Sequence, residues 1–397
     1  MHTDPAPSPR LTAATLLPRT VVVLGLVSFL NDAASEMITP LLPLFLTATL
    51  GAGPAIVGLV EGVAEATASV LKLVSGRLAD RGVRAKSLVV GGYALSNATR
   101  PLIGLAGAWF TVLALRFLDR VGKGIRTAPR DALIAGAVPA TQRGRAFGFH
   151  RSMDHAGAVV GPLIAFALLS AAVDLGTVFL ASVVPGLLVI ALLVLGVPGG
   201  ERFKAPAPVR FSWRSLHSRL RAMIVAAGAL ALASVPEVFI VLWATEAGME
   251  VKWVPLVWAA ASLAKMLIAM PAGIVSDRFG RMPVLLGGWA SRVVVLGLLA
   301  WLTQPSRPVV WGLFIAYSAT LAITEPAERS LIGDHAAEHE RGTAYGLYHL
   351  AGGLLVLPGA VVFGALWQQA GSSVAFAAAA TITALAAVWL LLLARPS

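Results

Sequence analysis

Long apolar segments separated by short polar breaks fill the chain from about residue 20 onward. A helix needs about 20 mostly apolar residues to cross a bilayer. Breaks at proline, glycine and clustered charges predict six such helices near residues 20–47, 53–77, 87–106, 109–133, 145–170 and 174–197. They predict six more near residues 221–246, 253–275, 284–303, 309–332, 343–367 and 372–394. We therefore expect an all-α membrane protein with twelve transmembrane helices.

Three short motifs of the first half recur in the second half, at offsets of 197 or 198 residues. The pairs are Gly76–Arg81 with Gly273–Arg278, Pro129 with Pro326, and Arg143–Gly148 with Arg341–Gly346. Such repeats typify transporters built from two halves around a central site near the membrane midplane. The boundaries predict a tail at 1–19, a six-helix bundle at 20–197, a linker at 198–220, a second six-helix bundle at 221–394 and a C-terminal end at 395–397.

The composition agrees with a lipid environment. Hydrophobic residues make up 57% of the chain and charged residues 13%, and the mean hydropathy is +0.80. A soluble domain carries about a quarter charged residues. The chain has no cysteine, which excludes disulfides, thiolate metal sites and a cysteine nucleophile.

The net charge of +11 follows the topology. Eighteen of the 31 Lys and Arg residues fall in the tails and in the loops after even-numbered helices, whereas the loops after odd-numbered helices hold two, Lys252 and Arg307. Basic loops stay on the cytoplasmic side of a membrane. We expect an inner-membrane protein with both termini in the cytoplasm, and no nucleic-acid partner.

The repeated motifs carry a family likeness. GRLADRGVRAK and GIVSDRFGRMP resemble the loop signature that the major facilitator superfamily has after helices 2 and 8, although Val83 replaces the later glycine of the first copy. RFLDRVGKG at Arg116–Gly124 resembles the helix-4 signature, with Arg120 in place of a usual glycine. The strings SFLNDAASEM and RFLDRVGKGIRTAPRDAL resemble a prokaryotic subgroup whose substrates are mostly unassigned.

A further likeness concerns the predicted fifth helix. Gly148, Gly157, Gly161 and Pro162 match the antiporter signature of that family, which here lacks its final glycine pair. The resemblance spans the chain. It implies a secondary transporter that works by alternating access, with helices 1, 4, 7 and 10 around the cavity and export as the direction.

Charged residues inside the predicted spans indicate where transport chemistry occurs. A charge at the bilayer centre costs at least about 2.5–3.5 kcal/mol, so such groups need partners or a wet cavity. We predict proton-coupling or cavity roles for Asp32, Glu36, Arg116, Asp119, Arg120, Asp154, His155, Glu237, Lys265 and Glu325. In the sharpest form of this prediction, Asp32 carries the coupling proton and Arg116 beside it tunes its proton affinity.

Residues at the cytoplasmic helix ends are expected to act as gates rather than ligands. They are Gly76, Asp80, Arg81, Gly273, Asp277, Arg278, Arg126, Arg130 and Asp131. His150, Asp154 and His155 could suggest a metal site, but their spacing does not converge on one ion. No nucleophile–base pair or phosphate-binding loop is visible, which argues against an enzyme or an ATP-driven pump. We expect no cofactor and a proton gradient as energy source.

The favoured function is therefore proton-coupled export, by antiport, of a polar, charged or zwitterionic small organic molecule. Three alternatives stay open: a proton symporter importing an organic anion held by Arg116, Arg120 and Lys265, a metal or metal-chelate exporter, and a non-transporting sensor or scaffold. The expected partners are the solute, protons and the lipid bilayer, and we expect a monomer.

Overall fold

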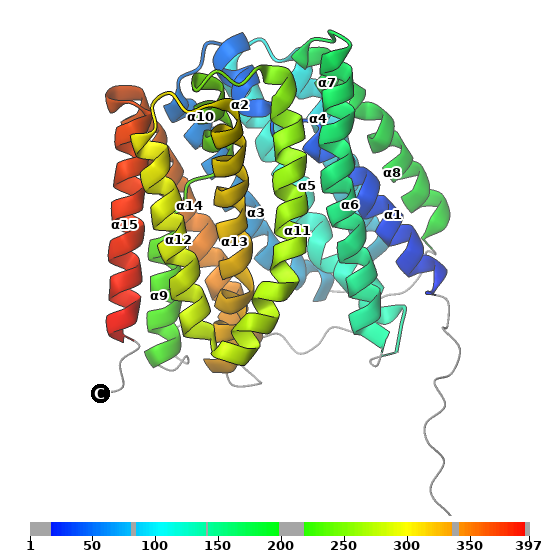
Figure 1. Cartoon of the computed structure of the whole chain (residues 1–397). Coiled ribbons are helices and arrows are strands. Elements are labelled where there is room, and N and C mark those ends of the chain that lie inside the picture. The colour runs from blue at the N-terminus through cyan, green and yellow to red at the C-terminus, as the bar shows by residue number, and fades with distance from the viewer. Residues whose placement is uncertain (1–16, 81–84, 140–141, 198–217, 336–340, 394–397) are drawn as a thin grey trace, which may run out of the picture.

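The computed structural model describes residues 17–80, 85–139, 142–197, 218–335 and 341–393, and in them the chain is a bundle of helices (Figure 1). The first group comprises α1 (Arg19–Glu36), α2 (Leu42–Leu44), α3 (Pro54–Asp80), α4 (Ala85–Leu102), α5 (Trp109–Gly136), α6 (Arg143–Ser170), α7 (Leu175–Ala181) and α8 (Val183–Gly196). The second comprises α9 (Ser218–Ala233), α10 (Glu237–Glu246), α11 (Val254–Phe279), α12 (Arg281–Trp301), α13 (Arg307–His335), α14 (Arg341–Ala370) and α15 (Ser372–Leu393).

Nine helical stretches in the described part of the chain are long and apolar enough to cross a bilayer. Helices α1, α4 and α5 are not among the nine. Helix α5 instead turns charged side chains inward, and Arg116, Asp119 and Arg126 are buried. The prediction of an all-α membrane protein is confirmed, whereas the count of twelve spans stays a prediction.

Two helices that we predicted as continuous are interrupted at matching places. The predicted helix 20–47 leaves α-helical geometry after Glu36 and resumes at α2. The predicted helix 221–246 stops at Ala233 and restarts at Glu237. Pro40 lies in the first break and Pro236 in the second, where proline removes a backbone donor and disfavours helix in the residue before it. Two carboxylates, Glu36 and Glu237, therefore stand at helix ends inside the bundle.

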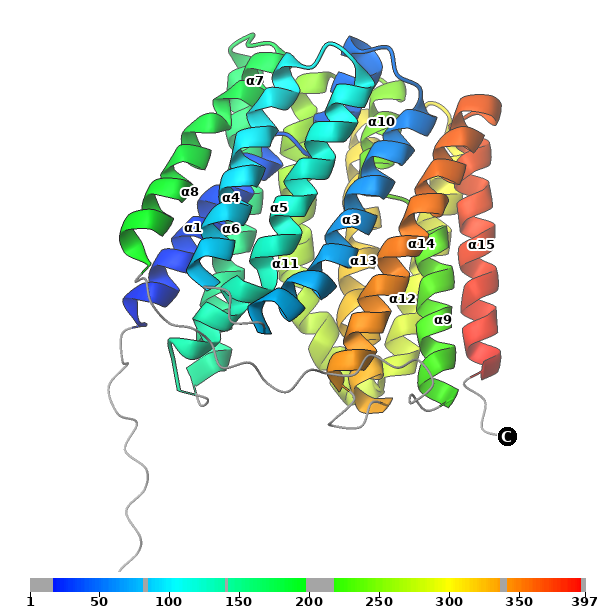
Figure 2. The same cartoon turned by 180° about the vertical axis from the view of Figure 1, so that it is seen from behind.

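The two groups of helices meet most extensively along two helix pairs. Helix α1 packs along α6 and α8, and α3 and α4 pack along α5; in the second group α11 packs on α13, α12 on α15 and α14 on α9. Between the groups, α3 packs along α14 and α6 along α11, and both views agree with this arrangement (Figure 2).

The α3–α14 contact brings two backbones together. A Cβ atom at Gly58 would lie 2.2 Å from the carbonyl oxygen of Ala360, and one at Gly364 would lie 2.4 Å from that of Pro54. Both distances are far inside van der Waals contact, so these positions need glycine for the helices to approach so closely.

A hydrophobic core closes one end of the bundle. It joins residues on both sides of the break after α1, such as Met37 and Leu41, to Phe239 of α10 and Phe314 of α13. Figure 1 shows α2, α7 and α10 at this end, which we call the loop end, whereas α1 begins and α15 ends at the opposite, terminal end. The core therefore separates the interior of the bundle from the loop end.

Candidate functional site

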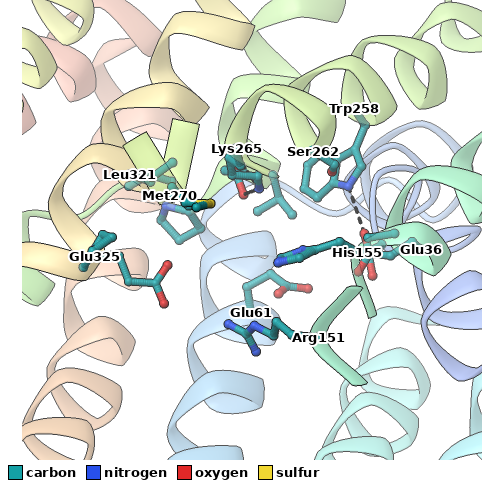
Figure 3. Close-up of a pocket in the computed structure, with 18 of the residues that line it drawn as sticks. Glu36, Glu61, Arg151, His155, Trp258, Ser262, Lys265, Met270, Leu321 and Glu325 are labelled. Atoms are coloured by element: carbon teal, nitrogen blue, oxygen red, sulfur yellow. Dashed lines mark hydrogen bonds and ion pairs between the residues drawn. The ribbon is translucent and has the colours of Figure 1, made fainter. Parts of the chain in front are cut away.

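A cavity of about 880 Å³ lies between the two groups of helices, below the break in α1 (Figure 3). Helices α1, α3 and α6 line one side, and α10, α11 and α13 line the other. Its polar lining residues are Glu36, Thr39, Glu61, Arg151, His155, Glu237, Ser262, Lys265, Glu325 and Ser330. A volume of this size, with convergent polar groups, is typical of small-molecule sites.

Glu36 and Trp258 join the two groups at this cavity. The indole Nε1–H of Trp258 on α11 donates to Oε2 of Glu36 at 2.9 Å. Figure 3 draws this bond beside His155, with Glu325 across the cavity. Glu36 is the last residue of α1, directly before the break, and its side chain reaches α11.

Lys265 is held on the opposite wall. Its Nζ donates to both carboxylate oxygens of Glu237, at 2.8 and 3.0 Å, and Glu237 also accepts the hydroxyl of Ser318 at 2.5 Å. The same ammonium group lies 5.8 Å from the centre of the Trp258 ring, within cation–π range. An indole face that accommodates an ammonium group therefore borders the cavity.

The lining is richer in acid than in base. Four carboxylates (Glu36, Glu61, Glu237 and Glu325) stand against two basic side chains, Arg151 and Lys265, so the formal charge is −2 when all six are ionised and His155 is neutral. Glu237 is paired with Lys265, and Glu61 with Arg116 behind the lining at 3.1 Å. The described donor to Glu36 is the neutral indole. When these carboxylates are ionised, the lining therefore carries a net negative charge.

Behind the cavity, a buried ion cluster ties four helices together. Asp119 of α5 is 0% exposed, and three guanidinium groups approach it: Arg100 at 2.8 Å, Arg116 at 3.5 Å and Arg120 at 4.0 Å. Arg100 also donates to the side chain of Asn31 on α1 at 2.9 Å. Removing a carboxylate with this many charged partners would leave buried cations without their counter-charge, so we expect Asp119 to act as a structural strut.

This cluster overturns one sequence prediction. Arg116 does not pair with Asp32; it lies between Glu61 of α3 and Asp119, one turn along its own helix. Asp32 accepts instead from the side chain of Asn31 at 3.0 Å. The error has a geometric cause, since residue spacing places Arg116 at the right depth but does not tell which neighbouring helix it faces.

A second polar cluster lies where α1 meets α6. Asp154 accepts the hydroxyl of Ser28, and Nδ1 of His150 lies 3.7 Å from its other oxygen. A Cβ atom at Gly157 would lie 2.3 Å from the carbonyl oxygen of Phe29, and one at Gly161 would lie 2.4 Å from that of Ala33. Gly157 and Gly161 of the fifth predicted helix therefore serve close packing against α1, whereas a Cβ atom at Gly148 would meet nothing within 4 Å.

Comparison with known proteins identifies the family to which this chain belongs. The sequence profile of the Major Facilitator Superfamily matches residues 24–355 and 238–397. An MFS-type transporter of Methanocaldococcus jannaschii, MJ1317, is 31% identical over 360 residues, which cover 89% of each chain. The chain belongs to the Major Facilitator Superfamily. The multidrug resistance protein MdtH of Aeromonas hydrophila is 28% identical over 356 residues, 87% of each chain.

Solved structures of this superfamily share the fold. The nucleoside transporter NupG superposes with a TM-score of 0.78 at 12% identity, covering 95% of this chain and 100% of its own. A bacterial homologue of the human lysosomal transporter Spinster, in an inward-facing and occupied conformation, gives a TM-score of 0.79 at 16% identity, with 94% and 96% coverage. A multi-pass secondary transporter with a small-molecule substrate follows from the family.

The cavity of this Major Facilitator Superfamily protein contains part of the predicted site. Five predicted residues line it: Glu36, His155, Glu237, Lys265 and Glu325. The other five are Asp32, Arg116, Asp119, Arg120 and Asp154. Arg116, Asp119 and Asp154 join neighbouring helices, whereas the described partners of Asp32 and Arg120, Asn31 and Asp119, lie on their own helices. The roles of all ten in coupling or binding stay predictions.

The predicted gating residues lie at the terminal end. Asp277 pairs with Arg281 across the turn into α12, Arg130 pairs with Asp131 at 2.8 Å, and Arg126 donates to Ser96 at 2.7 Å. Gly273 and Arg278 belong to the last turns of α11, and Gly76 and Asp80 to those of α3. The side chain of Asp80 and all of Arg81 lie outside the described residues. Gating stays a prediction for the whole set.

Three residues that the structure makes prominent were missed as site residues. Glu61 is absent from the predicted site residues, yet it lines the cavity. Arg100 is the sole charge in the apolar span 87–106, which is the signal that could have revealed it. Trp258 has no such signal, because a tryptophan in an apolar helix is usually interpreted as lipid-facing. Among the described residues, no group of three or more His, Asp or Glu forms a metal site.

Proposed function

We propose that this chain exports polar small organic molecules with cationic or zwitterionic groups, in exchange for protons, across the inner (cytoplasmic) membrane. The acid-rich cavity between the helix groups is the observation that carries the proposal. The name of the MdtH relatives, multidrug resistance protein, supports export as the direction. A solute amine would find the carboxylate of Glu36 and the face of Trp258 in one place.

Alternating access would use the two groups as its moving halves, bounded at 20–197 and 221–394 with the linker 198–220 between them. The hydrophobic core at the loop end fits a state open toward the terminal end. Release to the other side would then separate Met37 and Leu41 from α10 and break the bond between Glu36 and Trp258.

Coupling of solute transport to proton transport would follow from competition between the solute and the proton for the same carboxylates. A carboxylate that holds a proton no longer attracts a cation, so proton uptake favours solute release and solute binding favours proton release. Glu36 is placed for such competition because its described partner is neutral. Asp32 keeps its predicted coupling role on the α1–α6 contact, without the help of Arg116.

The anion-symport alternative receives less support. The three cations that it names already have carboxylate partners: Lys265 pairs with Glu237, Arg116 with Glu61, and Arg120 lies 4.0 Å from Asp119. An anion would have to displace a carboxylate from each of them, which costs part of its own binding free energy.

Flux measurements in proteoliposomes test the proposal. The probes are the zwitterion norfloxacin, the cation ethidium and the anion carboxyfluorescein, all fluorescent, and an imposed pH gradient supplies the driving force. We expect norfloxacin or ethidium to move against the proton flux, and carboxyfluorescein not to move. Movement of carboxyfluorescein in the direction of the protons would support the symport alternative and overturn the proposal.

A further inference from the structure

A second, smaller cavity of about 300 Å³ lies beside the first. We call it the side cavity. Helices α9, α12, α13 and α14 line it, and α3 contributes Glu65 and Ser69. Leu321 and Glu325 line both cavities, so the two spaces meet at these side chains. The site described above does not use the side cavity.

We propose that the side cavity is where this transporter takes up its coupling proton, with Glu328 as the group that holds it and Glu325 as the link to the solute cavity. The proposal rests on the proton coupling proposed above and gives it a location on the second group of helices. The proton on Glu328 would then lie beside the solute cavity, in addition to the competition of proton and solute for Glu36 within that cavity.

The described partners of Glu328 are neutral. Its Oε2 accepts the hydroxyl of Tyr348 at 2.8 Å, and its Oε1 lies 3.4 Å from the indole Nε1–H of Trp289. Both donors can hold a carboxylate, and neither brings a charge that opposes protonation. The Tyr348 hydroxyl can also rotate to accept a hydrogen bond from the protonated acid.

Asp119 provides the contrast within the same chain. Three guanidinium groups lie within 4.0 Å of it, and a proton would have to compete with all of them. The chain thus contains one buried carboxylate, Asp119, whose neighbours favour the charged form. It contains another, Glu328, whose hydrogen bonds are compatible with either protonation state.

Charged groups around Glu328 complete the site. Arg292 of α12 also lines the side cavity, and its guanidinium donates to the hydroxyl of Thr324 at 2.9 Å and lies 3.4 Å from that of Thr320. Anchored there, Arg292 is a fixed positive charge close to Glu328 but outside ion-pair distance. The titratable and charged groups that line the side cavity with Glu328 are Glu65 of α3, Arg292 of α12, Glu325 of α13, and Tyr348 and His349 of α14.

Proton uptake converts Glu328 from an anion to a neutral acid. A hydronium ion in the side cavity transfers its proton to one Glu328 oxygen and leaves a water molecule. The loss of one negative charge is felt at Glu325, one helical turn away on α13 and at the junction of the cavities. The electrostatic attraction between Glu325 and a cationic solute therefore differs in strength between the two protonation states of Glu328.

Infrared difference spectroscopy tests this without any solute. The purified transporter, in lipid nanodiscs, is titrated with acid, and the C=O stretch of a buried protonated carboxyl group is followed. We expect a band that Glu328→Gln removes and that Tyr348→Phe moves to higher pH, since the anion loses a donor. Glu246→Gln is the matched control, because Glu246 also accepts an indole N–H, from Trp367 at 2.9 Å, but lies near the loop end of α10. It should leave the band unchanged.

Flux then tests the link to transport. With ethidium as probe, Glu328→Gln should lower gradient-driven accumulation at least about fivefold while downhill exchange persists. A band that survives Glu328→Gln, or one that Asp32→Asn removes instead, overturns the proposal. If Glu328→Gln does not fold, an unchanged titration midpoint in Tyr348→Phe overturns it equally. Should no probe move, the proposed function fails for those probes, and the spectra still decide the role of Glu328.

Discussion

The carboxylate of Glu36 on α1 accepts the indole N–H of Trp258 on α11 at 2.9 Å, and this bond bridges the two groups of helices where the cavity meets the hydrophobic core. A hydrogen bond to a charged group contributes about 1.5–3 kcal/mol. The bond between Glu36 and Trp258 helps to keep the loop end closed, because opening that end would separate α1 from α11.

Trp258→Phe should therefore favour opening at the loop end. Leu41 is 0% exposed behind the core, so a cysteine placed there reacts with an impermeant maleimide only when that end opens. We expect the labelling rate of Leu41→Cys to rise up to about tenfold in Trp258→Phe. Trp367→Phe is the control, since its indole bonds Glu246 within the second group. Equal rates in both variants would rule out a latch role for Glu36 and Trp258.

Asp119→Asn should be among the most destabilising single substitutions in the chain. It removes the counter-charge of Arg100 and Arg116, and breaking a buried ion cluster in this way costs about 3–5 kcal/mol. Thermal unfolding in detergent measures the loss. Asp32→Asn is the comparison. The described side-chain donor to Asp32 is the neutral Asn31, so this substitution should lower the stability only slightly. Similar losses for the two variants would contradict the strut role of Asp119.

The Asp119 cluster also illustrates what the sequence could predict. Long apolar segments and the internal repeat correctly predicted an all-α membrane fold, and charges in apolar spans drew attention to Glu36, Glu237 and Lys265, which line the cavity although their roles stay predictions. The partner of Arg116 could not be predicted, because it depends on the rotation of α5 about its axis, which tertiary packing decides. The helix breaks near Met37 and Ser234 were missed although Pro40 and Pro236 mark them, since apolar content continues through both.

The ion pair of Lys265 and Glu237 should show measurable coupling. Lys265→Gln and Glu237→Gln each leave a partner without its counter-charge, so the double variant should recover part of the stability lost by the single variants. We expect a coupling of about 1 kcal/mol, since the Lys265 side chain is 30% exposed and water screens the pair. The control is Glu250 with Lys252, which are 2.7 Å apart but 48% and 44% exposed, and should couple close to zero. Equal coupling energies in the two double-mutant cycles would mean that the cavity does not strengthen the pair of Lys265 and Glu237.

Asp174 gives a pH-dependent test outside the spanning helices. It caps α7, and hydrogen bonds from the Thr177 hydroxyl and then the Thr177 backbone N–H hold its pKa below the ordinary value of 3.8. A lowered folded-state pKa means stability that is present above the unfolded pKa and lost as the pH falls through the folded value. Relative to Asp174→Asn, the wild type should therefore lose its advantage in melting temperature on acidification. A difference that is constant from neutral pH to about pH 3 would exclude this cap as a titrating group.

The orientation of the chain in the membrane can be tested with two single cysteines, because the sequence contains none. Basic residues in the linker predict that Ser212→Cys is cytoplasmic. Gln304→Cys lies in the exposed loop between α12 and α13, at the loop end, and should face outward. In intact cells an impermeant maleimide should label Gln304→Cys alone, and after lysis it should label both. Labelling of Ser212→Cys in intact cells would contradict this topology, and the acid-rich cavity of this structure would then open toward the outside of the cell.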